Sequence, residues 1–475
     1  MYARPLTSRK QYLLACLVGV GAGLLAVAFR YLLDLAAQKR LTFPPGALVA
    51  VAILGAVASL ALTRRVPEIS GSGIPYLKAV IRNLRALVWE RVLPAKFLGG
   101  LLGLGAGMAL GREGPTVQMG ASVGELLAER TGLNDHERRE LVAAGSGAGL
   151  AAAFNAPLSG MVFVLEELHA NFTSGTFLCT LVAAASADMV TRLFLGQQPA
   201  FHLPSVATPP LSWGPAFVLL GLTGGLAGTL FNRSLLASLS LFPRLFGRLS
   251  LVGAAVAGLL VGLAGCWMPA VTGDGERLLE LLPDQSLPIN ALLALLAVRL
   301  LLTMACYGCG APGGIFAPLL VLGALHGLIF ARLTGLEPLA CMVVSMAAYF
   351  TAIVRAPLTG MVLILEMTLS YNLMLPLLLA CGAASVVCEL TGNPPIYDAM
   401  MGRDTTVVAF RVRPGAPFEG RSLAELDLPE GCQAVGLGPE DVLRAGDELT
   451  ASIESEADST LEKLRLGTGC PAGNG

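Results

Sequence analysis

The sequence has few charged side chains for its length. Asp, Glu, Lys and Arg together make up 14% of its 475 residues, against about 25% in ordinary soluble domains. Hydrophobic residues make up 54%, and a soluble globule of this size could not hide so much apolar surface. The scarcity of charge excludes a soluble enzyme, a nucleic-acid-binding protein and a disordered chain. It indicates an all-α polytopic membrane protein that lies in a lipid bilayer.

Residues that usually carry metal or covalent chemistry are also sparse or badly spaced. The four histidines show no metal-ligand spacing, and the ten cysteines give no disulfide framework. Cys306 and Cys309 form a CxxC pair, but no second pair accompanies it, so we interpret both as small apolar residues. No Cys/His or His/Asp constellation suits an enzyme. We therefore predict a protein that is not an enzyme and that has no metal and no cofactor.

The charges are unevenly divided between two parts of the chain. Residues 401–475 carry 7 Lys+Arg and 13 Asp+Glu, a net charge of −6, which leaves 25 and 20 of the totals of 32 and 33, or +5, for residues 1–400. This shift predicts a membrane domain over 1–402 and a small soluble domain over 403–475.

Long apolar runs occupy much of the first part. Six are long enough to cross a bilayer, which takes about 20 residues: 12–36, 46–63, 175–196, 213–231, 250–268 and 290–307. Shorter runs broken by Gly and Pro lie at 93–110, 115–128, 141–153, 156–168, 316–332, 339–354, 356–370 and 374–390, as tilted or discontinuous helices do. Arg4, Arg9 and Lys10 before the first run predict a cytoplasmic N-terminus.

The chain repeats itself at a nearly constant offset. APLSGMVFVLE begins at Ala156 and APLTGMVLILE at Ala356, and eight of the eleven positions are identical. A second match, at an offset of 203, pairs Gly111 and Gly120 with Gly314 and Gly323. We expect two related halves, roughly 70–200 and 270–400. Duplicated membrane halves usually enclose a midplane site for a small solute or ion, although the repeat alone leaves parallel and inverted arrangements open.

Four segments place glycine just before a proline and an apolar run. They are GSGIP at 71–75, GREGP at 111–115, GGIFAP at 313–318 and GNPPIY at 392–397. Proline suits the first turn of a helix, and glycine lets the backbone come close to a ligand. Each segment is thus predicted to begin a helix. The free N–H groups of such an end can bind an anion without a full positive charge, although ordinary Gly-Pro turns remain the alternative for any one segment.

GSGIP, GREGP and GGIFAP, in this order and spacing, resemble the CLC family of chloride channels and chloride/proton exchangers. The resemblance covers roughly residues 12–402 and implies an inverted-repeat helical fold, a homodimer and one anion pathway per subunit, with bound chloride and no other cofactor. It implies a central chloride held by Ser72, Ile315, Phe316 and Tyr397. The surrounding backbone would be that of Gly71, Gly73, Arg112, Gly114 and Gly314.

Two glutamates stand out within this resemblance. A carboxylate at membrane depth costs about 2.5–3.5 kcal/mol on insertion scales, so Glu113 inside GREGP suggests a function beyond capping its helix. The resemblance makes it the gating glutamate and external proton site. Glu366 matches Glu166, which suggests a structural role for both. Glu167 has no counterpart in the second half, where Met367 stands, and the resemblance implies that it is the internal proton site.

The acidic tail changes character. The phrases GRSLAEL at 420–426 and RAGDEL at 444–449 resemble the C-terminal half of TrkA-type regulatory domains. This likeness implies a small α+β cytoplasmic domain with a possible small-molecule ligand. An acidic module that stabilises or dimerises the protein is the alternative.

The sequence therefore favours a secondary-active chloride/proton antiporter. A passive chloride channel, gated by voltage or protons, on the same fold is the main alternative. A cation transporter is suggested only by the tail, and no TVGYG-like filter or acidic ring supports it.

Overall fold

The computed structural model describes residues 9–168, 173–197, 206–283, 287–422, 425–426, 432–434, 442–444 and 447–454. The chain forms two compact units, each described by itself. The first consists of Met1–Ile74 and Val88–Ile396, and the second of Pro75–Leu87 and Tyr397–Gly475.

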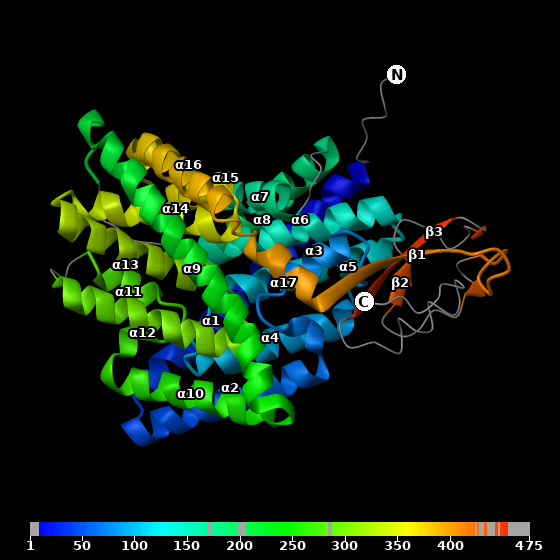
Figure 1. Cartoon of the computed structure of the whole chain (residues 1–475), viewed down its shortest axis with the longest axis horizontal. Coiled ribbons are helices and arrows are strands. Elements are labelled where there is room, and N and C mark those ends of the chain that lie inside the picture. The colour runs from blue at the N-terminus through cyan, green and yellow to red at the C-terminus, as the bar shows by residue number, and fades with distance from the viewer. Residues whose placement is uncertain are drawn as a thin grey trace. The chain divides into compact units, whose positions relative to one another are not determined.

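The elements are almost all helical (Figure 1). The longer helices are α1 (Arg9–Leu41), α2 (Pro45–Arg65), α3 (Ile74–Ile81), α4 (Trp89–Gly105), α5 (Glu113–Thr131), α6 (Asp135–Phe154), α7 (Pro157–Phe163), α8 (Ser174–Leu195), α9 (Gly214–Phe246), α10 (Ser250–Trp267), α11 (Glu276–Leu281), α12 (Ile289–Gly308), α13 (Phe316–Thr334), α14 (Pro338–Val354), α15 (Pro357–Thr368), α16 (Met374–Leu390) and α17 (Ile396–Asp404). The strands are β1 (Thr405–Arg411), β2 (Cys432–Ala434) and β3 (Glu448–Glu454).

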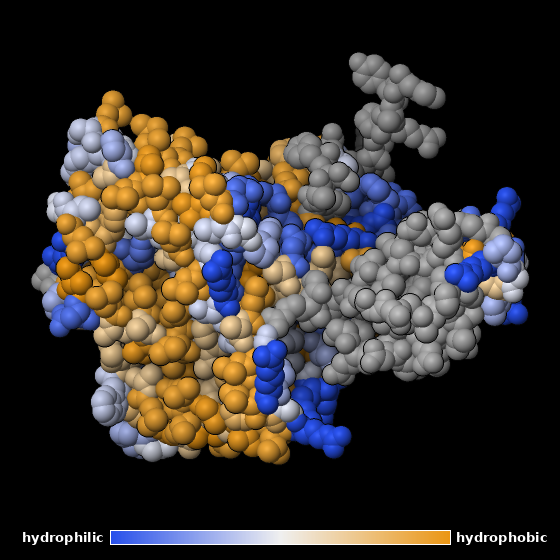
Figure 2. All heavy atoms as spheres, in the orientation of Figure 1, coloured by the Kyte–Doolittle hydropathy of each residue, from blue (hydrophilic) through white to orange (hydrophobic). Residues whose placement is uncertain are grey.

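The predicted apolar runs are helices, and the polytopic membrane fold is confirmed. Within the described residues, seven helical segments are long and apolar enough to span a bilayer. One prediction was too short: the run at 213–231 belongs to α9, which continues to Phe246. Hydrophobic side chains cover the face seen over α2, α9 and α10 (Figure 2), and leucines such as Leu230 and Leu263 are exposed there. Such a surface is suited to lipid rather than to water.

The predicted repeat appears as two helix sets that pack in the same way. In the first set α5 packs on α6, and α1 packs on α6 and α8. In the second set α13 packs on α14, and α9 packs on α14 and α16. The matched glycines explain the close α5–α6 and α13–α14 packing. A Cβ at Gly120 would lie 2.2 Å from the Gly145 carbonyl oxygen, and one at its match Gly323 would lie 2.9 Å from Met346 Cα. Small residues allow this approach inside a membrane protein.

Equivalent residues of the two halves pair with each other. Gly111 and Gly314, which the sequence repeat matched, form an antiparallel bridge, with N–H to oxygen distances of 2.8 and 2.7 Å. Antiparallel pairing of equivalent residues relates them by a local two-fold axis. This relation agrees with an inverted repeat at that point, which the sequence repeat alone had left open.

Glu166 and Glu366, which the repeat matches, each contact a helix of the opposite half. The Glu166 carboxylate accepts hydrogen bonds from the amides of Leu358 and Thr359, at 3.1 and 2.7 Å. The Glu366 carboxylate accepts equivalent bonds from Leu158 and Ser159, at 3.0 and 2.7 Å. Each carboxylate thus caps the N-terminus of α7 or α15 in the opposite half. The predicted structural role of both residues is confirmed.

The second unit contains α3 after Ile74, α17 after Ile396, and a sheet. The strands are antiparallel in the order β1-β3-β2, with Thr405 opposite Glu454 and Cys432 opposite Ile453. Lys78 on α3 pairs with Asp398 on α17 at 2.9 Å. Within the described residues after 404 we find strands and no further α-helix, so the helical part of the expected α+β tail domain is not seen there.

We expect Glu366→Ala to destabilise the protein by about 1–3 kcal/mol, because it leaves the α7 amides without their charged acceptor. Thermal unfolding in detergent measures the change. Glu389→Ala is the matched control: Glu389 pairs with Arg355 but its side chain is 73% exposed, and such pairs contribute only about 0–1 kcal/mol. Equal losses in the two variants would contradict the capping role.

Candidate anion site

All four Gly-Pro junctions begin helices, as predicted. α3, α5, α13 and α17 start at Ile74, Glu113, Phe316 and Ile396. In the first unit, three of the junctions also meet in space. Besides the Gly111–Gly314 bridge, the Gly313 amide donates to the Gly71 carbonyl oxygen at 2.9 Å. The backbone before α3, α5 and α13 is therefore held together by main-chain hydrogen bonds.

The Glu113 side chain occupies the N-terminus of α13. Its Oε1 accepts hydrogen bonds from the amides of Phe316, at 2.7 Å, and Ala317, at 3.3 Å. The side chain is fully buried, and its Oε2 has no hydrogen-bond partner among the described residues. A carboxylate on the first free amides of a helix lies where a bound anion would lie. Glu113, from one half, is therefore placed to compete with an anion for donors of the other half.

Glycines make room for this carboxylate. A Cβ at Gly314 would lie 2.2 Å from Glu113 Oε1, and one at Gly111 would lie 2.0 Å from Oε2. A Cβ at Gly114 would lie 2.8 Å from Ser72 Cα. Any larger residue at these positions would displace the carboxylate or the loop, so the glycines are required by the close approach of these atoms.

Ser72 lies in the junction before α3. Ser72 is fully buried, its amide donates to Tyr307 Oη at 3.3 Å, and Tyr307 Oη donates to Ser72 Oγ at 3.5 Å. The flanking Gly71 and Gly73 have φ angles of +54° and +78°, which favour glycine. Tyr307, on α12, thus fixes the serine that the sequence predicted as a chloride ligand.

The side chain of Lys96 holds the loop before α3 by hydrogen bonds. Lys96 on α4 is fully buried, and its Nζ donates to the carbonyl oxygens of Ile69, at 2.8 Å, and Gly71, at 2.7 Å. Among the residues that the structure describes, no carboxylate pairs with it. These two hydrogen bonds tie the loop before α3 to α4.

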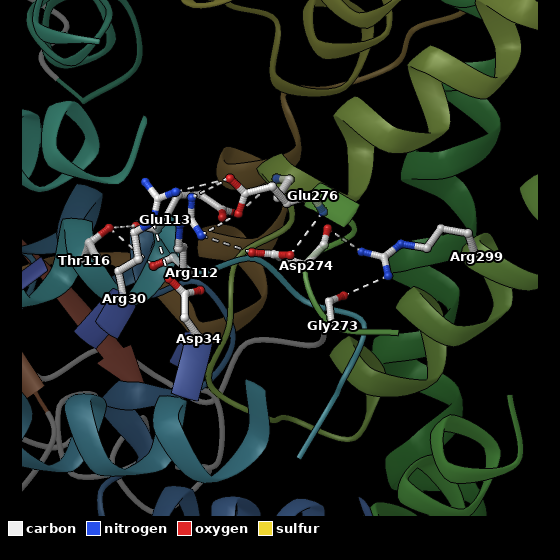
Figure 3. A network of polar contacts seen from close by, with 10 residues as sticks. Arg30, Asp34, Arg112, Glu113, Thr116, Gly273, Asp274, Glu276 and Arg299 are labelled. Carbon is white, nitrogen blue, oxygen red and sulfur yellow. Dashed lines mark hydrogen bonds and ion pairs between the residues drawn. The ribbon is translucent and has the colours of Figure 1, made fainter. Parts of the chain in front are cut away.

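Arg112 faces away from the Glu113 carboxylate and enters an ion-pair network (Figure 3). Its Nη1 lies 2.8 Å from Glu276 Oε2 and 3.4 Å from Asp274 Oδ2. Arg30 shares Glu276 at 3.4 Å. This side-chain contact is separate from the backbone role that the family resemblance implies for Arg112. The Arg112 charge is neutralised by carboxylates of the 274–276 segment.

The remaining predicted site residues lie as follows. Ile315 is buried and caps the N-terminus of α13, whereas the amides that donate to Glu113 are those of Phe316 and Ala317. Glu167 is buried in the π-helical turn Val164–Leu168. Tyr397 is buried in the first turn of α17 and belongs to the second unit, so its role beside Ser72 stays a prediction.

Sequence analysis missed three contributors: Ala317, Tyr307 and Lys96. Ala317 is the next residue after Ile315 and Phe316, the two donors that the GGIFAP segment predicted. Lys96 carried a usable signal, because a lysine within the apolar run 93–110 needs a partner at membrane depth. Nothing in the sequence around Tyr307 indicates its contact with a residue 235 positions earlier.

Comparison with known proteins agrees with this geometry. The family described as voltage gated chloride channel matches residues 54–389. The chain belongs to this family. It is 37% identical over 415 residues to the H(+)/Cl(-) exchange transporter ClcA of Vibrio cholerae, covering 82% of this chain and 88% of the relative. It is 36% identical over 416 residues to ClcA of Yersinia pestis, covering 82% and 87%.

Solved structures of this family have the same fold. A slow cyanobacterial Cl−/H+ antiporter matches with a TM-score of 0.79 and 35% identity, over 84% of this chain and 98% of that chain. A CLC-type fluoride/proton antiporter matches with a TM-score of 0.71 over 80% and 96% of the two chains. Its identity of 22% supports the fold alone.

We expect Lys96→Met to weaken chloride binding by about tenfold, or about 1.4 kcal/mol, because the loop that carries Ser72 loses the hydrogen bonds that hold its carbonyl oxygens. Isothermal titration of detergent-solubilised protein with chloride measures the change. Lys10→Met is the control, since exposed Lys10 makes a single hydrogen bond, to the Thr131 carbonyl oxygen. Unaltered chloride affinity in a folded Lys96→Met protein would contradict this role.

Proposed function

We propose that this protein is a secondary-active chloride/proton antiporter of the cell membrane. The observation that carries the proposal is the buried Glu113 carboxylate on the amides of Phe316 and Ala317. The antiporter names of its relatives and of the cyanobacterial structure support it.

The contact suggests how one residue couples two ions. An ionised Glu113 satisfies the helix amides and excludes chloride. Protonation removes its negative charge, so the amides lose their charged acceptor and chloride can take the place of the carboxylate. Each exchange of carboxylate for chloride then requires a proton on Glu113. A helix terminus binds either anion without the tight hold of a fully charged side chain, which allows turnover.

A proton must also reach Glu113 from the other side of the membrane. We propose Glu167 as the internal proton site, because it is buried in a non-regular turn and its counterpart in the second half, Met367, cannot titrate. The central chloride would be held by Ser72 and Tyr397 together with the amides at the start of α13.

We also infer a homodimer with one pathway in each subunit, a cytoplasmic N-terminus and a cytoplasmic tail of TrkA-C type that binds a small ligand. The sequence resemblances and the basic residues before α1 support these proposals. Chemical crosslinking in membranes tests the first, and accessibility of a cysteine introduced at Ser8 tests the second.

We expect Glu113→Ala in proteoliposomes to abolish chloride-driven proton uptake while chloride flux persists, because the site remains but its titratable competitor is gone. A pH-sensitive dye and a chloride electrode measure the two fluxes on one sample. Wild-type vesicles must acidify against the proton gradient when given a chloride gradient. Wild-type chloride flux without proton movement would instead identify a passive channel.

We expect Glu167→Gln to reduce proton uptake by at least about tenfold, a difference of 1.4 kcal/mol or more at the limiting step, with chloride flux retained. Glu166→Gln is the neighbouring control. Because Glu166 accepts bonds from α15 amides, it should lose stability rather than coupling. Full proton coupling in Glu167→Gln would reject the assignment.

A further inference from the structure

A polar cavity adjoins Arg112, the residue before Glu113. It has a volume of about 480 Å³ and is lined by the C-terminal part of α1, by Arg112 and by the segment from Pro269 to Glu280. The ion-pair network drawn in Figure 3 forms part of its wall. Asp274, which lines the cavity, is close enough to act electrostatically on the Glu113 carboxylate, so the cavity lies near that site.

Two of its arginines are compensated by carboxylates. Arg112 pairs with Glu276 and Asp274 at 2.8 and 3.4 Å. Arg30 pairs with Glu276 at 3.4 Å and with Asp34 at 3.9 Å. These pairs cancel most of the charge that the two side chains would present to the cavity.

Two further arginines nearby are also accounted for. Arg299 on α12 is fully buried and donates to the carbonyl oxygens of Val271, Gly273 and Asp274, at 2.6–2.7 Å. It fixes the segment that carries the acidic residues. Arg277 lines the cavity but is exposed, so water solvates its charge.

Arg40, in the last turn of α1, differs from the other four. It is only 9% exposed, yet its guanidinium has no hydrogen bond or ion pair with any residue that the structure describes. The group is pressed against the backbone of Gly107, which has a φ angle of +100° and where a Cβ would lie 1.4 Å from Arg40 Nη1. The nitrogens of Arg40 are not fully enclosed, and Asp274 acts on their charge from beyond ion-pair distance. A guanidinium in such a place is costly unless an anion or water meets it.

The cavity favours a small monovalent anion as the ligand. Carboxylates of Asp34, Asp274, Glu276 and Glu280 share the wall and would repel a multiply charged anion more strongly than a single charge. A neighbouring cavity of about 180 Å³, which Arg40 also borders, is lined mainly by apolar side chains such as Leu48 and Val261. The hydrated anion therefore fits the larger, polar cavity.

We propose that Arg40 forms a recruiting site where a chloride ion binds in this cavity before it reaches the amides at the start of α13. The inference rests on the proposed antiport. A fixed positive charge at a low-dielectric wall raises the local anion concentration and the rate of capture. The dipoles at Phe316 and Ala317 then bind the ion without a full charge beside them.

The test is the chloride dependence of transport by Arg40→Gln in proteoliposomes, with chloride presented on each face in turn. On the face reached by the C-terminal end of α1, we expect KM for chloride to rise about threefold or more. The maximal rate and the chloride-to-proton ratio should stay unchanged. Added impermeant salt should reduce the difference from the wild type, because it screens the charge.

Three controls separate recruitment from damage to the fold. Arg40→Lys keeps the charge and should restore the wild-type KM, and Arg277→Gln, on the same cavity but solvated, should leave it unchanged. If Arg40→Gln does not fold, Arg40→His gives the contrast within one protein, because histidine is charged at pH 5 and neutral at pH 8. The ratio of its KM to that of the wild type should rise over this range.

Several outcomes would overturn the inference. These are an unchanged KM in folded Arg40→Gln, an equal effect of Arg277→Gln, or a constant KM ratio for Arg40→His. An effect seen only in vesicles that contain phosphatidylglycerol, and absent in phosphatidylcholine, would assign Arg40 to a lipid phosphate instead. Wild-type vesicles that move no protons with chloride would reject the antiport itself, whatever the Arg40 variants do.

Discussion

The proposed antiport depends on one competition, between a carboxylate and an anion for the free amides at the start of a helix. Glu113 can take part only because its helix and α13 begin at the same place. That arrangement needs the Gly111–Gly314 bridge, and it needs residues without side chains at 111, 114 and 314. The glycines, the prolines and the glutamate of these junctions therefore serve a single steric and electrostatic requirement.

The duplication supplies this arrangement with little additional structure. Each half provides a helix start, and the two-fold relation turns the starts toward each other, so the carboxylate of one half meets the amides of the other. Elsewhere in the molecule, Glu166 and Glu366 likewise accept hydrogen bonds from helix-terminal amides of the opposite half. In both places a free helix terminus in an apolar surrounding is satisfied by a carboxylate from the opposite half.

Much of this could be predicted, and the limits have physical causes. Helix positions followed from apolar runs, and helix starts from Gly-Pro junctions, because both signals are local. The matched pair Gly111 and Gly314 came from the repeat, and the structural role of Glu166 followed from its match to Glu366. Contacts made by long side chains did not follow, since neither Tyr307 against Ser72 nor Arg112 against Glu276 leaves a pattern in the sequence. The length of α9 was missed because Asn232 and Arg233 interrupt the apolar run, and the helix continues past them.

The placement of full charges follows from the same competition. A cation in contact with the α13 amides would bind the Glu113 carboxylate or chloride too tightly for turnover. Positive charges near these amides must therefore be neutralised or lie at a distance. Arg112, next to Glu113 in the chain, is neutralised by Glu276 and Asp274. Lys96 is turned toward carbonyl oxygens behind the Ser72 loop, and Arg40 lies in a separate cavity. In the proposed antiport, charges attract the anion from a distance while dipoles bind it, and a carboxylate as weakly held as the anion can displace it.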